Sequence, residues 1–326
     1  MKGKRIKYMD MAKGIGIILI VICHNPINDV LNDWFFSFHV PLFFIVSGFF
    51  MKEGFSSKSF KKDILHLWVP YLLCCFVVFM LNIDYSEEIH WNVLNYLAYR
   101  IVPKTGWEVI GMWFLPALFW GKTILAVLLT KIKEKKYVYI ITLFLFFISS
   151  LYPFFQEYID NPLYIINGFA VPLFLCIGML MKEHHLIEYN YNKYMKGVGI
   201  LFMIVAFYFP VNMFTNSFPV SILNVVISSI VCLGVCMCCR KFEQHKNKLS
   251  RFVIGILAYY GKYSLVILCA HALFHYPLRN CFLPINDSLW GISEVIVLSS
   301  GPLVVSFLPG VRYILNVPKT VQLLKA

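Results

Sequence analysis

Charged side chains are scarce in this sequence: they make up only 14 % of its 326 residues. A soluble chain is about half apolar and carries about a quarter charged residues. Here 59 % of the residues are hydrophobic and the mean hydropathy is +0.70. One aqueous core cannot hide that excess, so a lipid bilayer is expected to be the solvent for much of the surface. The composition excludes an ordinary soluble enzyme.

A soluble domain, an internal repeat and a low-complexity region are also missing from the sequence. The first apolar run, from Gly14, follows a basic start, but no small-residue cleavage site comes after it. We therefore expect this run to stay as an anchor instead of being removed as a secretory signal. Residues 1–326 are expected to form one membrane-embedded domain with no appended soluble domain.

The chain has no pattern typical of a disulfide framework or a metal site. Nine of its ten cysteines lie in or at the ends of apolar runs, where they are expected to be small packing residues. His271 and His275 have the i, i+4 spacing of a metal-binding pair, but no third ligand follows at a suitable spacing. We expect no metal cofactor.

Ten apolar segments can be counted, which predicts an all-α, polytopic bundle of about ten transmembrane helices. Most of them are long enough to cross a hydrocarbon core of about 30 Å at about 1.5 Å per residue. They cover residues 9–25, 35–51, 66–83, 109–129, 137–154, 163–181, 197–214, 219–239, 258–276 and 289–308.

Lysine and arginine are concentrated in every second connecting segment. With the N-terminus inside, the inner segments carry 25 of these residues and the outer loops carry three. The positive-inside rule therefore places both termini in the cytoplasm. The basic residues behind the formal charge of +12 are expected to orient the chain in the membrane and to contact anionic lipids. They do not indicate nucleic-acid binding, because the sequence has no basic stripe with interleaved aromatic residues. The inner segments are 1–13, 52–62, 131–136, 182–196, 240–262 and 312–325.

The first apolar segment carries polar residues on one face. Eleven helical steps of about 100° bring His24 to nearly the azimuth of Lys13, about 16 Å further along the axis. Asp10 lies one turn before Lys13. An ionisable side chain inside a bilayer has a high free-energy cost, so its presence there indicates a structural or functional role. Two interpretations stay open: an interfacial ion pair with a helix-end histidine, or a functional face whose imidazole transfers protons.

Later segments also carry polar or helix-breaking residues. His39 lies at the outer start of the second segment, where Pro41 suits the first turn of a helix. Ser47 and Gly48 are small residues that favour close helix packing. Trp113 stands just before Pro116, which is expected to kink the fourth segment and so to open a cavity.

Four stretches of this sequence resemble motifs of the acyltransferase-3 family of bacterial membrane acyltransferases. The first, YMDMAKGIGI at 8–17, is followed by His24 and so has the family's basic residue, ten-residue gap and histidine. The second is FHVPLFFIVSGF at 38–49. WFLPAL at 113–118 is similar to a central-helix motif, and GKYSL at 261–265, followed by His271, resembles a late-helix motif. The chain differs from the family pattern in having lysine at Lys13, and Lys61, Lys62 and His66 before its Pro-Tyr pair.

The resemblance implies transfer of an acyl group, usually acetyl from acetyl-CoA, onto a hydroxyl of a surface glycan or its lipid-linked precursor. It places the protein in the bacterial cytoplasmic (inner) membrane as a multi-pass protein. His24 would be a general base or a transient acyl carrier, with Asp10 holding Lys13 in place. The phosphates of CoA would be attracted by Lys13, Lys61 and Lys62. The acceptor would be bound by His39, Ser47, Trp113 and His271.

Two other classes remain as alternatives. A transporter or flippase for a lipid-linked sugar is compatible with ten helices and polar residues at depth, although no repeated halves are visible. A non-catalytic membrane subunit would tolerate replacement of Asp10, Lys13 and His24. Transfer or hydrolysis of acyl-CoA in detergent separates an acyltransferase from both.

Overall fold

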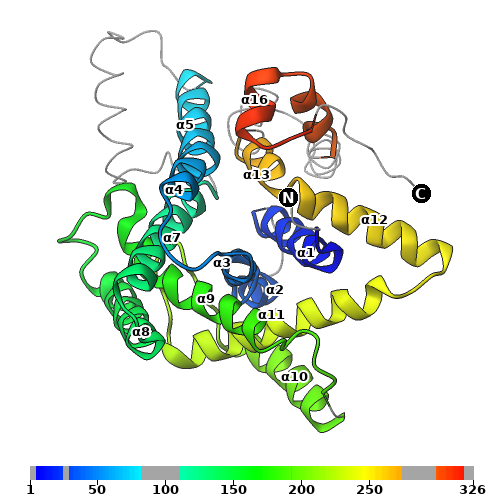
Figure 1. The fold of residues 1–326 in the computed structure, drawn as a ribbon, viewed down its shortest axis with the longest axis horizontal. Helices are drawn as coiled ribbons and strands as arrows, with labels where there is room; N and C mark the ends of the chain where they lie inside the picture. The colour runs from blue at the N-terminus through cyan, green and yellow to red at the C-terminus, as the bar shows by residue number, and fades with distance from the viewer. Residues whose placement is uncertain (1–4, 25–28, 82–110, 192, 274–298, 319–326) are drawn as a thin grey trace.

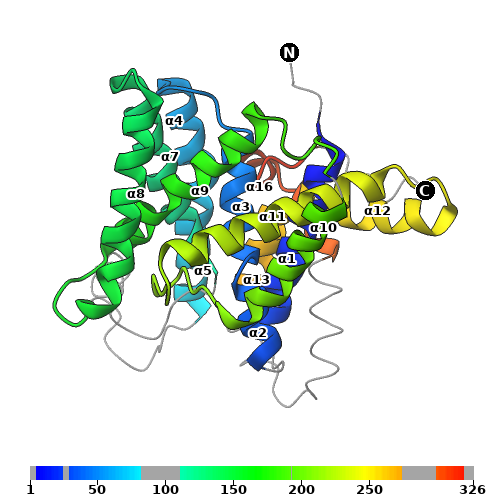
Figure 2. The same cartoon turned by 90° about the horizontal axis from the view of Figure 1, so that it is seen from below.

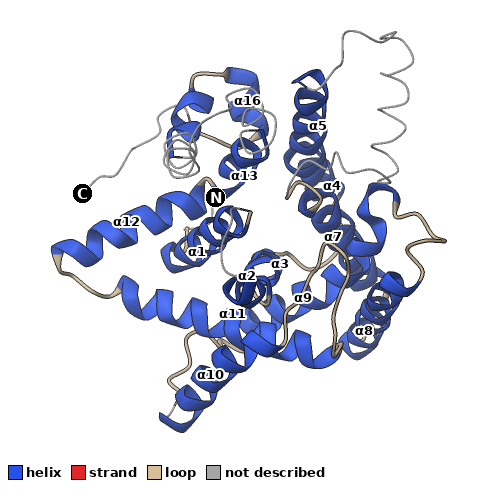
Figure 3. Ribbon diagram, turned by 180° about the vertical axis from the view of Figure 1, so that it is seen from behind, coloured by secondary structure: helices blue, strands red, loops and turns tan. Residues whose placement is uncertain are grey.

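The computed structural model describes residues 5–24, 29–81, 111–191, 193–273 and 299–318. In these ranges the chain is helical, without strands apart from an isolated bridge between Asn212 and Ser217 (Figure 3). The predicted all-α class is confirmed. The helices are α1 Lys7–Cys23, α2 Asp29–Phe36, α3 His39–Phe49, α4 Ser57–Asp63, the π-helix η1 Ile64–Trp68, α5 Val69–Leu81, α7 Phe114–Lys131, α8 Lys135–Leu151, η2 Tyr152–Phe154, η3 Pro162–Tyr164, α9 Ile165–Glu183, α10 Lys193–Val205, η4 Ala206–Tyr208, α11 Ile222–Glu243, α12 Lys248–Lys262, α13 Ser264–Leu273 and α16 Pro309–Ile314.

Five helices in the described part of the chain are long and apolar enough to cross a membrane, or six if α12 and α13 form one bent span. Half of the predicted segment 289–308 lies outside the described residues, and so do all of residues 84–108, which connect the third and fourth predicted segments. The count of ten helices and the orientation of the termini therefore stay predictions. The five spans are Asp29–Phe49, Phe114–Lys131, Lys135–Phe154, Pro162–Glu183 and Ile222–Glu243.

Four of the segments predicted to lie inside meet on one side of the molecule. Lys135 Nζ lies 3.0 Å from Glu53 Oε1 and 3.1 Å from Glu183 Oε1. Arg240 donates to the carbonyls of Ile187 and Glu188 at 3.4 and 3.3 Å. Figure 2 shows the loops that follow α7 and α9 toward the same side as α4 and the start of α1. These contacts among predicted inner segments agree with the alternation of inner and outer segments on which the predicted topology depends.

Helix α1 lies among other helices near the middle of the bundle, beside α12 (Figure 1). Two glycines make this contact possible. A Cβ atom on Gly14 would lie 2.0 Å from the carbonyl oxygen of Leu257, and one on Gly261 would lie 1.6 Å from that of Asp10. The two backbones touch at a distance that only glycine permits, as at other membrane helix interfaces with small residues.

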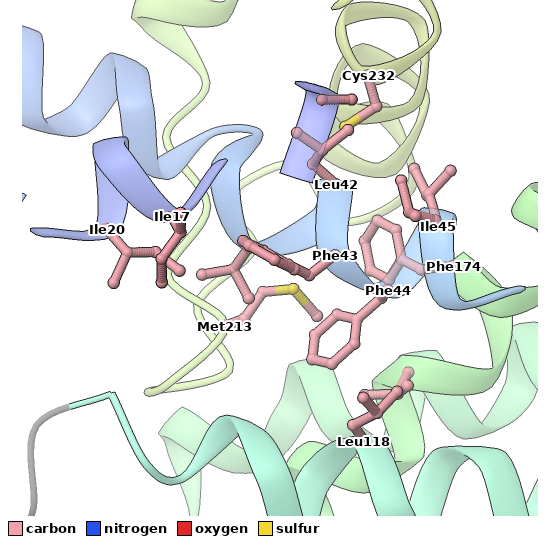
Figure 4. Packing of buried hydrophobic residues seen from close by; sticks show 14 of the residues in the cluster. Ile17, Ile20, Leu42, Phe43, Phe44, Ile45, Leu118, Phe174, Met213 and Cys232 are labelled. Carbon is pink, nitrogen blue, oxygen red and sulfur yellow. The ribbon is translucent and has the colours of Figure 1, made fainter. Parts of the chain in front are cut away.

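Helices α3 and α9 form a second close contact, so the packing role predicted for Gly48 is confirmed. A Cβ on Gly48 would lie 2.1 Å from the carbonyl oxygen of Leu175, and one on Gly178 would lie 1.9 Å from that of Ile45. Figure 4 shows the buried cluster between these helices and α1.

The outer surface of the bundle differs from this buried cluster. Apolar side chains on α8 such as Phe144 are exposed, as expected for a surface that faces lipid.

Two local expectations were wrong. Pro116 does not kink a helix interior: α7 begins at Phe114, so proline lies in the first turn, where no hydrogen bond is lost. The predicted span 258–276 is interrupted by a bend of 69° between α12 and α13.

The Gly261 contact leads to a stability prediction. Gly261→Ala should lower the free energy of unfolding in detergent by about 3 kcal/mol, because two helix backbones would have to move apart. Gly234→Ala on α11 is the matched control: no atom lies within 4 Å of its added Cβ, so unfolding followed by circular dichroism should show no loss. Equal stability of the two variants would contradict the close α1–α12 contact.

Candidate functional site

A cavity of about 200 Å³ lies where the end of α1 meets α2, α3, α7, α13 and the loop before α11. Its wall is mostly apolar and aromatic with a few polar side chains, which is the usual character of a small-molecule site. The lining residues are Ile20, His24, Phe36, His39, Val40, Gly111, Trp113, Phe114, Tyr164, Asn212, Met213, Phe214 and Leu268.

His24 lies at the C-terminal end of α1, where its ring makes a hydrogen bond one turn back. Its Nδ1 is 2.7 Å from the carbonyl oxygen of Ile20. A carbonyl can only accept, so Nδ1 carries the proton and the neutral ring keeps its lone pair on Nε2. This is the tautomer that can accept a proton or attack an electrophile through Nε2.

His39 lines the same cavity and is held in the same way. Its Nδ1 is 2.6 Å from the carbonyl oxygen of Phe35, so this ring also keeps the Nε2 lone pair. The side chain is 1 % exposed. Two imidazoles from α1 and α3 are therefore brought together, although 14 residues separate them in the sequence.

His271 of α13 packs behind His24, with 5.0 Å between the ring centroids. It is fully buried and is not part of the cavity wall. His275, the second residue of the predicted histidine pair, lies outside the described residues. Within the described ranges, no group of three or more histidine, cysteine, aspartate or glutamate residues is arranged to hold a metal ion.

Aromatic rings make up one part of the cavity wall. The ring of Phe214 lies 5.8 Å from Trp113 and 6.4 Å from Tyr164, centroid to centroid. Tyr164 has a left-handed backbone, with φ of 56°. Gly111, with φ of 70°, packs against His24, because a Cβ there would lie 3.9 Å from the ring carbon Cε1. Four segments distant in sequence thus build one surface.

Asp10 lies on the same helix as His24 but toward its other end. Its carboxylate accepts from Lys13 Nζ at 2.9 Å and from Arg5 Nη2 at 3.2 Å, and it forms a second bond with Arg5 Nε. The side chain of Asp10 is 9 % exposed, against 24 % for Lys13. The predicted contact between Asp10 and Lys13 is present, and Arg5 joins it, which the sequence did not indicate.

Lys61 and Lys62 are exposed on the short helix α4. The π-helix η1 follows at once, and π-helical turns are frequent at functional sites. Asp63, at the junction, forms an ion pair with Lys122 of α7, so the lysine inside the fourth apolar segment is neutralised there. His66 Nδ1 lies 2.5 Å from the carbonyl oxygen of Ile314 and ties this region to α16.

The structure brings some of the predicted site residues together and separates others. His24, His39 and Trp113 share the cavity, while Ser47 is half-buried on α3 and not part of its wall. Tyr164, Asn212 and Phe214 were missed because they lie inside the predicted apolar segments 163–181 and 197–214, where nothing distinguished them from other residues of a span. The Asn-Pro step at Asn161, just before Tyr164, was the one sequence signal for a structured turn there.

A family model described as an acyltransferase domain matches residues 6–311, nearly the whole chain. Searches of curated proteins and of solved structures found no match.

The charge cluster around Asp10 leads to a second prediction. Asp10→Asn should lower the free energy of unfolding by about 2 kcal/mol, because two cations lose the buried carboxylate that binds them. Asp33→Asn, at an exposed position of α2, should have little effect. Unfolding in detergent at matched salt measures both, and an equal response of the two variants would refute the cluster.

Proposed function

The chain belongs to the acyltransferase-3 family. From that premise we propose that it transfers an acyl group, in the first place the acetyl group of acetyl-CoA, to a hydroxyl of a cell-surface polysaccharide or its lipid-linked precursor. We also propose the bacterial inner membrane as its location. The observation that carries this proposal is the cavity in which His24 and His39, both in the Nε2 lone-pair tautomer, lie together.

His24 acts on the acceptor hydroxyl in the proposed reaction. Its Nε2 takes the hydroxyl proton while the oxygen attacks the thioester carbonyl carbon, and the carbon–sulfur bond then breaks. The proton passes to the departing sulfur, which leaves as the thiol of CoA. In the covalent variant, Nε2 attacks the thioester carbonyl carbon first, and the carbon–sulfur bond breaks to release the thiolate of CoA. The hydroxyl then takes the acyl group from the imidazole, and its proton neutralises the thiolate. Both routes yield one acyl ester and one CoA.

Other residues orient the groups that react. The bond from His24 Nδ1 to Ile20 and the packing of His271 hold the catalytic ring in one orientation. His39 and Trp113 are assigned to the acceptor side, where the Nε2 lone pair of His39 can accept a hydrogen bond from a hydroxyl of the acceptor. Ser47 lies outside the cavity wall, so we assign it a contact only with an acceptor that extends beyond the cavity.

The donor is assigned to the basic residues at the other end of the bundle. Lys13, Lys61 and Lys62 attract the phosphates of CoA, and Asp10 orients Lys13. Figure 2 supports this assignment, because α4 and the start of α1 lie toward one side of the molecule and α2 toward the other. The acyl group therefore has to travel along α1 to reach His24.

His24→Ala should reduce acyl transfer by at least about 100-fold, because the group that accepts the hydroxyl proton is lost. The measurement is release of CoA together with mass spectrometry of the acylated glycan. His184→Ala, at an exposed position after α9, is the control and should retain activity. Full transfer by a folded His24→Ala variant would refute the assignment, and a wild-type protein that releases no CoA would favour a transporter or flippase.

The double substitution Lys61→Ala with Lys62→Ala should raise the KM for acetyl-CoA about fivefold with little change in kcat, since exposed charges contribute modestly to binding. The effect should shrink as salt is added, because screening weakens the attraction. The matched control replaces Lys131 and Lys133, which are equally exposed. If both double variants change KM alike, the lysines of α4 have no special role.

A further inference from the structure

Buried amide side chains of neighbouring elements contact the loop at residues 209–217, which lies between η4 and α11. Asn167, in the first turn of α9, is 1 % exposed. Its Nδ2 donates to two successive carbonyls of the loop, Met213 at 2.8 Å and Phe214 at 2.7 Å. Its Oδ1 accepts from Asn161 Nδ2 at 2.5 Å. Both donors and the acceptor of this buried amide are therefore used.

Further contacts hold the same loop elsewhere. Ser149 of α8 donates to Asn216 Oδ1 at 2.8 Å, and Asn224 of α11 donates to the carbonyl of Phe209 at 3.1 Å. Within the loop, Asn212 and Ser217 exchange backbone hydrogen bonds of 3.0 and 2.8 Å. Backbone groups removed from water need such partners. Helices α8, α9 and α11 thus fix the loop in one conformation.

The loop presents an aromatic side chain, which can pack on a sugar ring, and an amide side chain, which can hydrogen-bond to its hydroxyls. Asn212, Met213 and Phe214 all line the cavity that contains His24. Phe214 extends an aromatic surface with Trp113 and Tyr164. The Oδ1 of Asn212 accepts hydrogen bonds from the backbone amides of Phe214 and Thr215 at 3.1 and 3.2 Å. These two bonds hold the side-chain amide in place through its oxygen and do not use its Nδ2.

We propose that loop 209–217 is the wall that recognises the acceptor, and that Asn167 is the residue that positions it. The ligand class is a single sugar ring of the glycan, whose apolar face packs on Phe214 and whose hydroxyls meet the amide of Asn212. This inference rests on the proposed function. Asn167 contacts the loop backbone, not the substrate, so it is a positioning residue and Phe214 is the contact.

Displacement of the loop has a distinctive chemical consequence. A hydroxyl held slightly out of line with His24 reacts far more slowly. Water needs no wall to position it, so it can still take the acyl group. Loss of the anchor therefore changes how the acyl group is divided between glycan and water. A purely structural role of Asn167 would reduce both products together and leave their ratio unchanged.

The test uses membranes from the strain that encodes the protein, with each variant as its sole copy. Acetyl-CoA labelled in the acetyl group is added, and label is counted in the glycan and in free acetate. Asn167→Leu, similar in size but unable to donate, should lower the glycan-to-acetate ratio about tenfold. Phe214→Ala should lower it too without disturbing the anchor. Thr142→Val is the control, because Thr142 is buried on α8 and bonds to its own helix.

The outcomes separate the two proposals. Wild-type membranes that put no label into glycan would overturn the proposed function and this inference with it. If the wild type labels glycan but Asn167→Leu and Phe214→Ala keep its ratio, the inference alone is wrong. A parallel fall of both products in Asn167→Leu, with the ratio kept by Phe214→Ala, also overturns it. If Asn167→Leu does not fold, the ratio for Phe214→Ala decides.

Discussion

The contact between the backbones of α1 and α12 determines where the polar residues of this protein can lie. Gly14 and Gly261 let the two helices approach so closely that any side chain at either position would meet a carbonyl group. Helix α1 thereby becomes an interior helix, in contact with α3, α11 and α13 as well. A helix that carries Asp10, Lys13 and His24 is costly to expose to lipid. Inside the bundle, the same groups find partners from neighbouring turns and helices.

The same constraint explains the other polar groups at depth. Lys122 is matched by Asp63, and Asn167 by two loop carbonyls and Asn161. Each arrangement joins elements that are far apart in the sequence. In an apolar medium a missing hydrogen bond costs more than it does in water, so each pair also restricts how the elements can be placed. Polar groups therefore contribute to the shape of the bundle as well as to any chemistry.

Helix α1 separates two different environments. Toward its start lie Arg5, Asp10 and Lys13, a charged group. At its end lies His24, in a cavity with mostly apolar walls. In the proposed reaction these would serve the polyanionic donor and the sugar acceptor, about 16 Å apart along the axis. A reaction that links the two sides of a membrane requires such a separation, since the donor is charged and must stay near water.

The sequence by itself determined the helical class, the alternation of basic segments, the Asp10–Lys13 pair and the packing role of Gly48. These properties depend on hydropathy and on residues within a few turns of one another. It also identified three residues of the cavity, His24, His39 and Trp113, but only through family resemblance or their place in an apolar run. Tertiary structure alone decided that these residues meet, and that Tyr164, Phe214 and the loop held by Asn167 complete the wall. The physical reason is that helix periodicity fixes which residues share a face, whereas contacts between distant loops depend on how whole helices pack.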